Sequence, residues 1–345
     1  MPGGKSGGMD LLVLGGTEFV GRAVAEAAVE RGWQVTVFHR GRHPAPEGVR
    51  VLTGDREGDL SALAAGRWDA VVDTWSGAPG AVRESARLLA DRVGRYAYVS
   101  SRSVYAYPPP DGLDETATVV EPRGADDADD ADDADDADDY AAVKRGGELA
   151  AEEVFGDRAL FVRAGLILGP WENVGRLPWW LNRVARGGDV LAPGPRDLPL
   201  QYIDVRDLAA WTLDAVADGL GGPYNLVSAP GHTTMGELLE SCLAVTGSSA
   251  VLRWTDPAVI EAAGIEPWTE LPVWLPPGPL HAAMHGGDVS KALASGLRCR
   301  PVGETVADTW EWLRSLPGPP PQRPDRPAVG LSPTAESRAL STPHP

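Results

Sequence analysis

The sequence has 345 residues, which is enough for one large domain or two small ones with an ample core. Its net charge of −18 argues against a broad nucleic-acid-binding surface, and no apolar run approaches membrane-spanning length. Two cysteines, Cys242 and Cys299, do not make a disulfide framework, and with no hydrophobic signal peptide they predict a cytoplasmic protein.

Residues 1–8 are expected to form a flexible leader, and the stretch 11–40 then predicts a strand, a glycine turn, a helix and a second strand. Residues 11–14 are a short apolar run, as expected of a strand buried on both faces. Residues 21–31 repeat apolar side chains at helical spacing, and 35–38 form the second apolar run. Two parallel strands joined by a helix make a βαβ unit, whose turn is a binding place for a dinucleotide pyrophosphate.

The turn itself is the segment GGTEFVGR. Gly15 permits a tight bend, Gly21 allows close packing of helix on strand, and the helix N-terminus adds a partial positive charge. The segment resembles the nucleotide-binding turn of the extended short-chain dehydrogenase/reductase superfamily, which includes NAD-dependent epimerases and dehydratases. Glu18 stands where a second glycine is usual, as in the atypical branch of that superfamily. The cofactor-binding candidates of this turn are Gly15, Thr17, Glu18, Phe19, Val20 and Gly21.

The second strand ends in His39, followed by Arg40 and Arg42. NAD-using relatives place an acidic residue at this strand end to hold the ribose 2′-hydroxyl. Here two guanidinium groups are available instead, and they suit a 2′-phosphate by charge and geometry. We therefore expect NADP(H) in preference to NAD(H), with solvated loop charges as the alternative interpretation of both arginines.

Two further strands are predicted over 49–55 and 68–74. The resemblance places Asp55 near the adenine, while its alternative role is to cap the next helix. Asp73, Thr74 and Trp75 follow at a carboxyl strand end, where open α/β sheets bind ligands, and they complete the cofactor-binding candidates. A helix over 81–93 then leads to a fifth strand over 95–101.

The catalytic candidates are Ser101, Tyr140 and Lys144. Ser101 lies in YVSSRSVYA, which resembles the family segment that carries the substrate-orienting Ser or Thr. Tyr140 and Lys144 share one face of a helix predicted over 140–153, and a nearby ammonium favours the phenolate needed for acid–base work at neutral pH. The resemblance implies that Tyr140 exchanges the substrate proton, and that Lys144 also holds the nicotinamide ribose.

The predicted fold is a doubly wound Rossmann-type α/β sheet with a smaller C-terminal substrate-binding lobe. The dinucleotide-binding domain covers 9–170, with a sixth strand within 158–169 and with five Ala-Asp-Asp copies at 125–139 as a solvated, self-repelling insertion. The lobe covers 171–200 and 229–315, interrupted by a return to the sheet at 201–228, where Asp207 is the expected helix N-cap. The proline-rich residues 317–345 are expected to be disordered.

Arg102, Arg176 and Trp179 are the candidate substrate contacts. Sugar 4,6-dehydratases carry an Asp-Glu pair where Arg102 and Ser103 stand, so that elimination is not expected. Many nucleotide-sugar enzymes carry a diphosphate-binding Arg where Leu200 stands; the replacements available here are Arg176, Arg183 and Arg186. His281 and His285 have a metal-like spacing but no third ligand nearby, so no metal is expected.

Three functions remain open at this point. The first is an NADP(H)-dependent oxidoreductase for a small carbonyl or alcohol, and the second is an epimerase that retains its cofactor. The third is a non-catalytic cofactor sensor or RNA-binding protein, which the complete Ser101–Tyr140–Lys144 set and the acidic charge disfavour. The expected partner is a small-molecule substrate rather than a nucleic acid or membrane, and a homodimer is left open.

Overall fold

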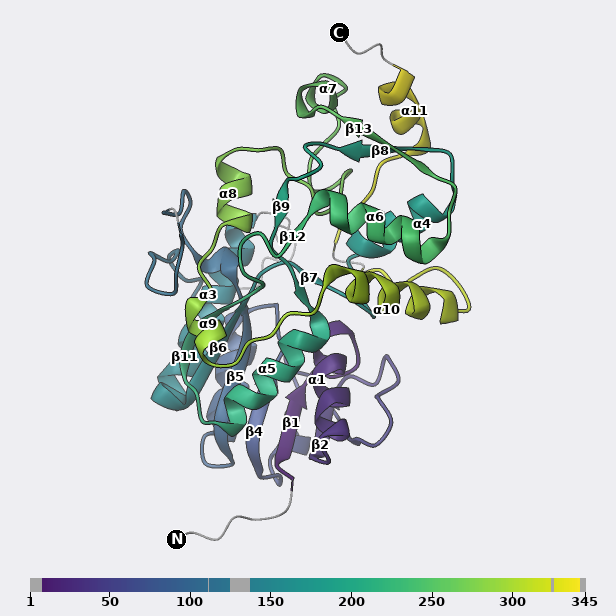
Figure 1. The fold of residues 1–345 in the computed structure, drawn as a ribbon. Helices are drawn as coiled ribbons and strands as arrows, with labels where there is room; N and C mark the ends of the chain where they lie inside the picture. The colour runs from purple at the N-terminus through teal and green to yellow at the C-terminus, as the bar shows by residue number, and fades with distance from the viewer. Residues whose placement is uncertain (1–7, 111, 125–136, 324–325, 342–345) are drawn as a thin grey trace.

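The computed structural model describes residues 8–110, 112–124, 137–323 and 326–341, and its largest element is a seven-stranded sheet (Figure 1). Every neighbouring pair in this sheet is parallel. Across the sheet the strands are β11 (Gly222–Leu226), β6 (Ala159–Ala164), β5 (Val93–Ser101), β4 (Trp68–Asp73), β1 (Asp10–Leu14), β2 (Gln34–His39) and β3 (Arg50–Thr53). The strand order reverses between β1 and β4, so the predicted doubly wound fold is confirmed.

Helices cover both faces of the sheet, as the uninterrupted apolar runs of its strands require. Leu11 and Val13 point into the core under α1 (Phe19–Glu30) and α5 (Val205–Ala217). Leu12 and Leu14 point into the opposite core, under α2 (Pro79–Leu89) and α3 (Ala137–Phe155). Alternate side chains of the same strand therefore pack into two separate hydrophobic cores, one on each face of the sheet. The carboxyl ends of the parallel strands lie along one edge.

The smaller lobe lies beyond that edge and has its own core around the fully buried Trp180 and Trp274 (Figure 1). Three short strand pairs belong to this part of the chain: β7 (Ile167–Leu168) with β10 (Ile203–Asp204), β8 (Asp189–Pro193) with β13 (Val251–Thr255), and β9 (Pro199–Leu200) with β12 (Thr233–Thr234). Its helices are α4 (Arg176–Ala185), α6 (Met235–Thr246), α7 (Pro257–Ala262), α8 (Pro279–His285) and α10 (Val302–Ser315). None of the helices in the described ranges is long and apolar enough to cross a membrane.

One part of the predicted lobe belongs to the sheet instead. Helix α9 (Ser290–Ala294) lies against β11, and Ala292 and Leu297 join the core beneath α1 and α5 (Figure 1). The predicted boundary at 229–315 was therefore wrong for this segment, because its apolar side chains pack under the edge strand.

The predicted N-cap of α5 was also wrong. Asp204 is the cap, with its carboxylate accepting a hydrogen bond from the Arg206 amide at 2.8 Å. Asp207 lies in the first turn and holds Arg300 through two contacts of 2.9 and 2.7 Å. The helix begins earlier because Asp204, at the end of β10, already offers a side chain of the right type.

The expectation of a disordered tail over 317–345 was wrong for its described residues near the end. Residues Pro333–Ser341 form helix α11, which packs beside β8. Buried Leu331 and Ala339 enter the lobe core, and buried Glu336 accepts a bond from Arg183 Nε at 2.6 Å. The proline-rich, polar composition predicted disorder, but two apolar contacts and one buried ion pair anchor this segment. The leader at 1–7 and residues 125–136 of the acidic insertion lie outside the described residues.

Candidate active site

The glycine turn lies at the point where the strand order reverses. Gly15 and Gly16 have φ of +111° and +89°, in the region that favours glycine. A Cβ at Gly15 would lie 2.4 Å from Thr74 Oγ1, and one at Gly21 would lie 2.6 Å from the Gly16 nitrogen. Thr74 itself donates a hydrogen bond to the Leu14 carbonyl at 3.0 Å. The ends of β1 and β4 and the start of α1 are thus packed too closely for side chains at these positions.

The N-terminus of α1 leaves backbone donors for an anion. The first helical hydrogen bond runs from the Arg22 amide to the Glu18 carbonyl at 3.1 Å, so the preceding amides have no helical acceptor. Thr17, Phe19 and Val20 lie in this same turn. The Glu18 side chain forms no cap; it lies 3.5 Å from Asn173 Nδ2 and 3.7 Å from His43 Nε2. Glu18 therefore ties the turn to its neighbours and leaves the helix amides to a ligand.

The end of β2 carries positive charge without a carboxylate. Arg40 and Arg42 are exposed, and the ion pairs recorded among the described residues include neither of them. The His39 ring accepts the Gly41 amide at 3.1 Å, and its burial, with His43 nearby, lowers the pKa of His39. Asp55 accepts the Glu57 amide at 3.2 Å, so its carboxylate forms a turn after β3.

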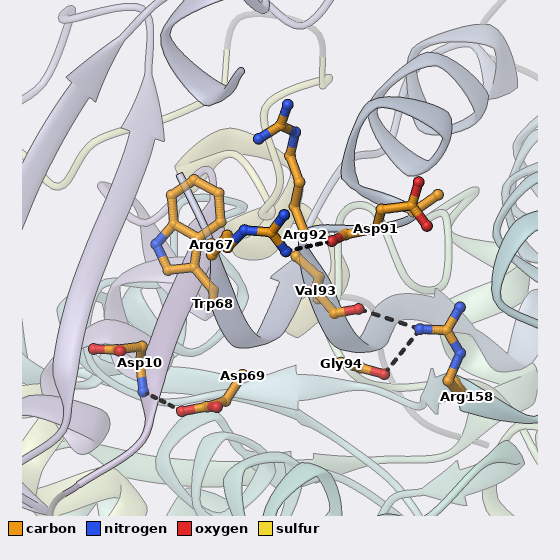
Figure 2. A pocket seen from close by; sticks show the side chains of 10 residues that line it. Asp10, Arg67, Trp68, Asp69, Asp91, Arg92, Val93, Gly94 and Arg158 are labelled. Atoms are coloured by element: carbon orange, nitrogen blue, oxygen red, sulfur yellow. Dashed lines mark hydrogen bonds between the residues drawn. The ribbon is translucent and has the colours of Figure 1, made fainter. Parts of the chain in front are cut away.

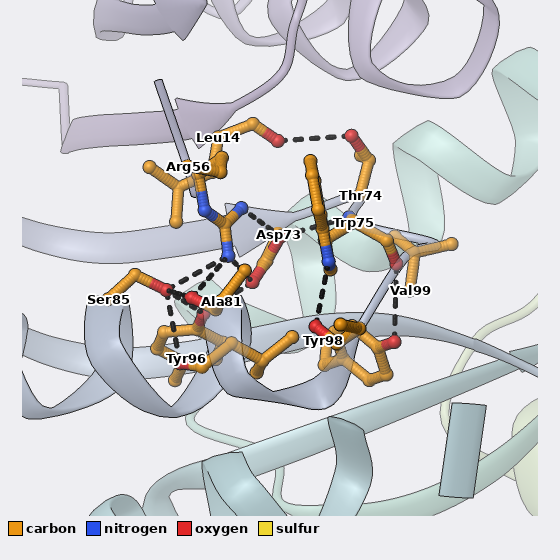
Figure 3. Close-up of polar contacts among 12 residues, drawn as sticks. Leu14, Arg56, Asp73, Thr74, Trp75, Ala81, Ser85, Tyr96, Tyr98 and Val99 are labelled. Carbon is orange, nitrogen blue, oxygen red and sulfur yellow. Dashed lines mark hydrogen bonds and ion pairs between the residues drawn. The ribbon is translucent and has the colours of Figure 1, made fainter. Parts of the chain in front are cut away.

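The Asp73 carboxylate, at the end of β4, is completely buried in a polar network (Figure 3). Arg56 holds it with two contacts of 2.7 and 2.9 Å, and the Tyr96 hydroxyl donates a third at 2.5 Å. Burial alone would raise the pKa of Asp73, but Arg56 and Tyr96 lower it below its ordinary value. The carboxylate is therefore turned inward, where it also accepts the Trp75 amide at 2.9 Å. Arg56 was missed from the sequence, because its partner is 17 residues away on another strand.

Lys144 joins helix α3 to the sheet. Its Nζ donates to the Trp75 carbonyl at 2.6 Å and to the Val99 carbonyl at 2.8 Å. The Tyr98 hydroxyl also donates to the Trp75 carbonyl, at 3.2 Å (Figure 3). Burial lowers the pKa of Lys144 to about 7, while the negative charge of Asp73 opposes that shift. The two carbonyl acceptors likewise favour the ammonium form.

Ser101 and Ser100 have different environments. Ser100 is buried and donates to Glu148 at 2.7 Å, and Arg163 holds the same carboxylate. Ser101 is only partly buried at the end of β5, and its Oγ pairs with the amide and hydroxyl of Ser103 at 3.1 Å. Of the two, Ser101 is thus the hydroxyl with access to a ligand.

Tyr140 lies one turn before Lys144 on α3 and is partly buried. Its ring faces a residue that sequence reasoning placed in a disordered tail, because Arg326 Cζ lies 5.0 Å from the ring centroid. The amide of nearby Arg323 donates to the Asn173 carbonyl at 2.9 Å. No sequence motif marks these two arginines, and only the folding back of the C-terminal segment brings them to the site.

The three predicted substrate contacts have different roles. Arg102 is buried, and its guanidinium donates to the Met284 carbonyl at 3.1 Å and the Ala283 carbonyl at 3.3 Å, so it caps the C-terminus of α8. Trp179 packs edge-on against Trp180, with ring centroids 4.6 Å apart. Arg176 begins α4, and its Cζ lies 5.4 Å from the Trp268 ring centroid. Burial lowers the pKa of Arg176, Glu172 opposes that shift, and Arg326 adds to it, so Arg176 shares the electrostatic environment of Tyr140.

Two other places do not contribute to this site. A depression of about 480 Å³ lies at the amino ends of β1, β4 and β5, the opposite edge of the sheet (Figure 2). Two of its three arginines are already bonded, Arg67 to the Asp91 carbonyl at 2.8 Å and Arg158 to the Val93 and Gly94 carbonyls at 3.2 Å. His281 and His285 bond the Pro199 carbonyl and the Gln201 amide, both at 2.9 Å. No group of three metal-ligating side chains was found among the described residues.

The chain is similar to one reductase in sequence and to several enzymes in structure. The chain is 30% identical over 268 residues to the 2-alkyl-3-oxoalkanoate reductase of Stenotrophomonas maltophilia, covering 70% of this chain and 77% of that one. Among solved structures it resembles the Bordetella bronchiseptica enzyme WbmH in complex with NAD+, with a TM-score of 0.66, 18% identity and coverage of 89% and 99%. It also resembles the UDP-N-acetylglucosamine 4-epimerase of Methanobrevibacter ruminantium, with a TM-score of 0.64, 15% identity and coverage of 90% and 99%. No family model matches the chain.

Proposed function

The chain belongs to the NAD-dependent epimerase/dehydratase family of extended short-chain dehydrogenases/reductases, and on that premise we propose an NADP(H)-dependent oxidoreductase acting on a small carbonyl or alcohol. As a member of that family it is an enzyme of the NAD(P)-dependent oxidoreductase/epimerase class. The observation that carries the finer proposal is Lys144, whose Nζ bonds the Trp75 carbonyl just after β4 and the Val99 carbonyl on β5. These bonds fix the helix of Tyr140 against the edge that carries the glycine turn.

The turn fits a dinucleotide. The close approach at Gly15 and Gly21, and the amides ahead of Arg22, suit a pyrophosphate at the start of α1. Exposed Arg40 and Arg42 suit a 2′-phosphate, and the inward-turned Asp73 leaves the cofactor edge to backbone groups and Thr74. When bound, the nicotinamide supplies or accepts the hydride.

The side chains then divide the remaining work. The Tyr140 hydroxyl gives a proton to the substrate oxygen during reduction and takes it back during oxidation. The Ser101 hydroxyl donates a hydrogen bond to the same oxygen and orients it. Lys144, one turn away on the same helix, holds that helix to the sheet through the Trp75 and Val99 carbonyls.

The first substrates to test are 3-oxo acids, because the 30% identical relative is named for reducing them. A UDP-sugar has less support. Leu200 is 1% exposed in the lobe core, and Arg183 is buried against Glu336, so neither can bind a diphosphate. Arg176 and Arg186 remain as alternatives from the predicted set.

The cofactor assignment is tested by titrating the purified protein with NADPH and NADH while following tryptophan fluorescence. We expect NADPH to bind more tightly, and Arg40→Ala to lose about tenfold in NADPH affinity while NADH is spared. Arg314→Ala, an exposed arginine at the end of α10, is the matched control. Equal losses for both nucleotides in Arg40→Ala would defeat the 2′-phosphate assignment.

The alternative is an epimerase that keeps its cofactor through an internal oxidation and reduction, and the likeness to a 4-epimerase favours testing it. Mass spectrometry of the denatured protein distinguishes the two functions. A retained stoichiometric nicotinamide with no net turnover supports the epimerase, whereas exchangeable NADPH with net turnover supports the oxidoreductase.

A further inference from the structure

The C-terminal segment, described over residues 316–323 and 326–341, is anchored at several points around the candidate site. The Arg323 amide bonds the Asn173 carbonyl at 2.9 Å, and the Gly330 amide bonds the Thr269 carbonyl at 2.7 Å. Asn173 Nδ2 in turn lies 3.5 Å from Glu18 of the glycine turn. Beyond Gly330, Leu331 and α11 pack into the lobe core. The segment therefore runs from α10 past the site and is held on both sides of it.

Arg326 is the residue of this segment that meets the catalytic helix. Its Cζ lies 5.0 Å from the centroid of the Tyr140 ring, and no carboxylate of the described ranges forms an ion pair with it. Arg176, from the lobe, interacts electrostatically with both Arg326 and Tyr140. Lys144 interacts electrostatically with Arg323 and Arg326. Arg326 is thus in contact with the Tyr140 ring, and the charge of Arg176 acts on the same place from the lobe.

Among the described residues, the carboxylates that act on Lys144 are already held by other arginines, Asp73 by Arg56 and Glu148 by Arg163. Glu172 is fully buried, and its two oxygens accept the amides of Arg176 and Leu177 at 2.8 and 3.2 Å. Burial raises the pKa of Glu172 to about 7, so at neutral pH this carboxyl is only partly ionised. A positive cluster beside a reacting hydroxyl, in a chain of net charge −18, is suited to an anionic ligand group.

We propose that the C-terminal segment completes the active site, and that Arg326, with Arg176, binds an anionic group of the substrate beside Tyr140. This rests on the proposed function, because Tyr140 is taken as the acid–base group. A carboxylate and a phosphate share the chemistry that two guanidinium groups recognise. Arg326 would set substrate specificity, while Tyr140, Ser101 and Lys144 carry the reaction.

The test measures binding to the full-length protein saturated with NADPH, so that an alcohol product cannot react. The probes are 3-hydroxybutanoate, its neutral methyl ester, inorganic phosphate and acetate, each titrated by calorimetry. We expect at least one anion to bind, and the hydroxy acid to bind about tenfold more tightly than its ester. The tighter of phosphate and acetate then identifies the anionic group that the site prefers.

Variants of Arg326 supply the decisive comparison. Arg326→Ala should lose about tenfold in affinity for the anions and nothing for the ester, and Arg326→Lys should recover part of that loss. Arg338→Ala, on the exposed side of α11, is the matched control. The proposal is overturned if Arg326→Ala binds the anions as the wild type does, or if the wild type binds the acid and ester equally.

The test of the anion site can be distinguished from the test of the proposed function. If the protein fails to bind NADPH, the proposed function fails, and phosphate is titrated into the protein without cofactor. Phosphate binding that is lost in Arg326→Ala would still support the anion site, whereas no phosphate binding by the wild type would overturn it as well.

Discussion

At Gly15, one missing methyl group determines how closely two strands and a helix can approach. Its φ of +111° is strained for any other residue, and a Cβ there would lie 2.4 Å from Thr74 Oγ1. We expect Gly15→Ala to lower the free energy of unfolding by ~2–4 kcal/mol and to weaken NADPH binding at least about tenfold. Thermal or denaturant unfolding and an NADPH titration measure the two effects.

Gly32→Ala is the control for that substitution. Gly32 has a similar φ of +75°, but a Cβ there would meet no atom within 4 Å. Its replacement should cost only ~1–2 kcal/mol through backbone strain and leave NADPH affinity unchanged. Equal effects from the two substitutions would mean that steric closeness at the turn has no special importance.

Glu172 provides a pH test at the same scale. Its pKa is raised by burial to about 7 from an ordinary value near 4.5, so between these values the folded state binds more protons than the unfolded state. The stability due to this group is complete below about pH 4.5 and is lost as the pH rises through 7.

Glu172→Gln lacks that titration. The stability of the wild type relative to Glu172→Gln should therefore fall by ~1–3 kcal/mol between pH 4.5 and pH 8. Denaturant unfolding at a series of pH values measures the difference, with Glu311→Gln on an exposed part of α10 as the control. A stability difference between wild type and Glu172→Gln that stays constant, or that grows with pH, would show that burial does not raise the pKa of Glu172.

Individual roles at the site were less predictable than the positions themselves. Asp73 was expected among the cofactor contacts, and its place at the carboxyl end of β4 is as expected, but its carboxylate faces Arg56 and Tyr96. Arg102 was expected near the substrate, and its guanidinium caps α8 instead. The hydrogen-bond partners of Asp73 and Arg102 come from distant parts of the sequence, so no local sequence pattern predicts them.

At the scale of elements, a buried ion pair and apolar contacts such as that of Ala339 hold α11 to the lobe. Glu336 accepts Arg183 Nε at 2.6 Å and the Leu191 amide at 3.1 Å. Glu336→Ala would leave the buried guanidinium of Arg183 without its carboxylate, and we expect the free energy of unfolding to fall by ~3–5 kcal/mol. Denaturant unfolding measures this, and Glu311→Ala, at an exposed position, should change little. A loss no larger than that of the control would mean that α11 is dispensable.

The helices and strands of the sheet were largely predictable, because apolar runs and helical spacing are local signals. Strand β5 begins two residues before the expected position 95, and α2 ends at Leu89 rather than at 93. The tail and α9 were not predictable in this way. Their positions depend on a few contacts with residues far away in sequence, such as Arg183 with Glu336.

At the scale of the whole molecule, the site combines three segments that the sequence separates widely. We propose that the glycine turn, the Tyr140 helix and the C-terminal segment form one site, because parallel strands end at one edge of the sheet and because α11 anchors the tail to the lobe. The family and the doubly wound sheet were predicted from a short motif in its βαβ context, and both are confirmed. NADP(H) preference and the Ser101–Tyr140–Lys144 assignment stay predictions.

The central claim is hydride transfer assisted by Tyr140, and the most direct measurement follows the hydride itself. NADPH carrying deuterium at both C4 positions is incubated with a 3-oxo acid and either the wild type or Tyr140→Phe, and the product is analysed by mass spectrometry. We predict one deuterium in the hydroxy acid from the wild type, and a rate about 10²–10⁴ lower for Tyr140→Phe with NADPH affinity within a few-fold. An unlabelled product, or a variant that keeps the wild-type rate, would contradict the account.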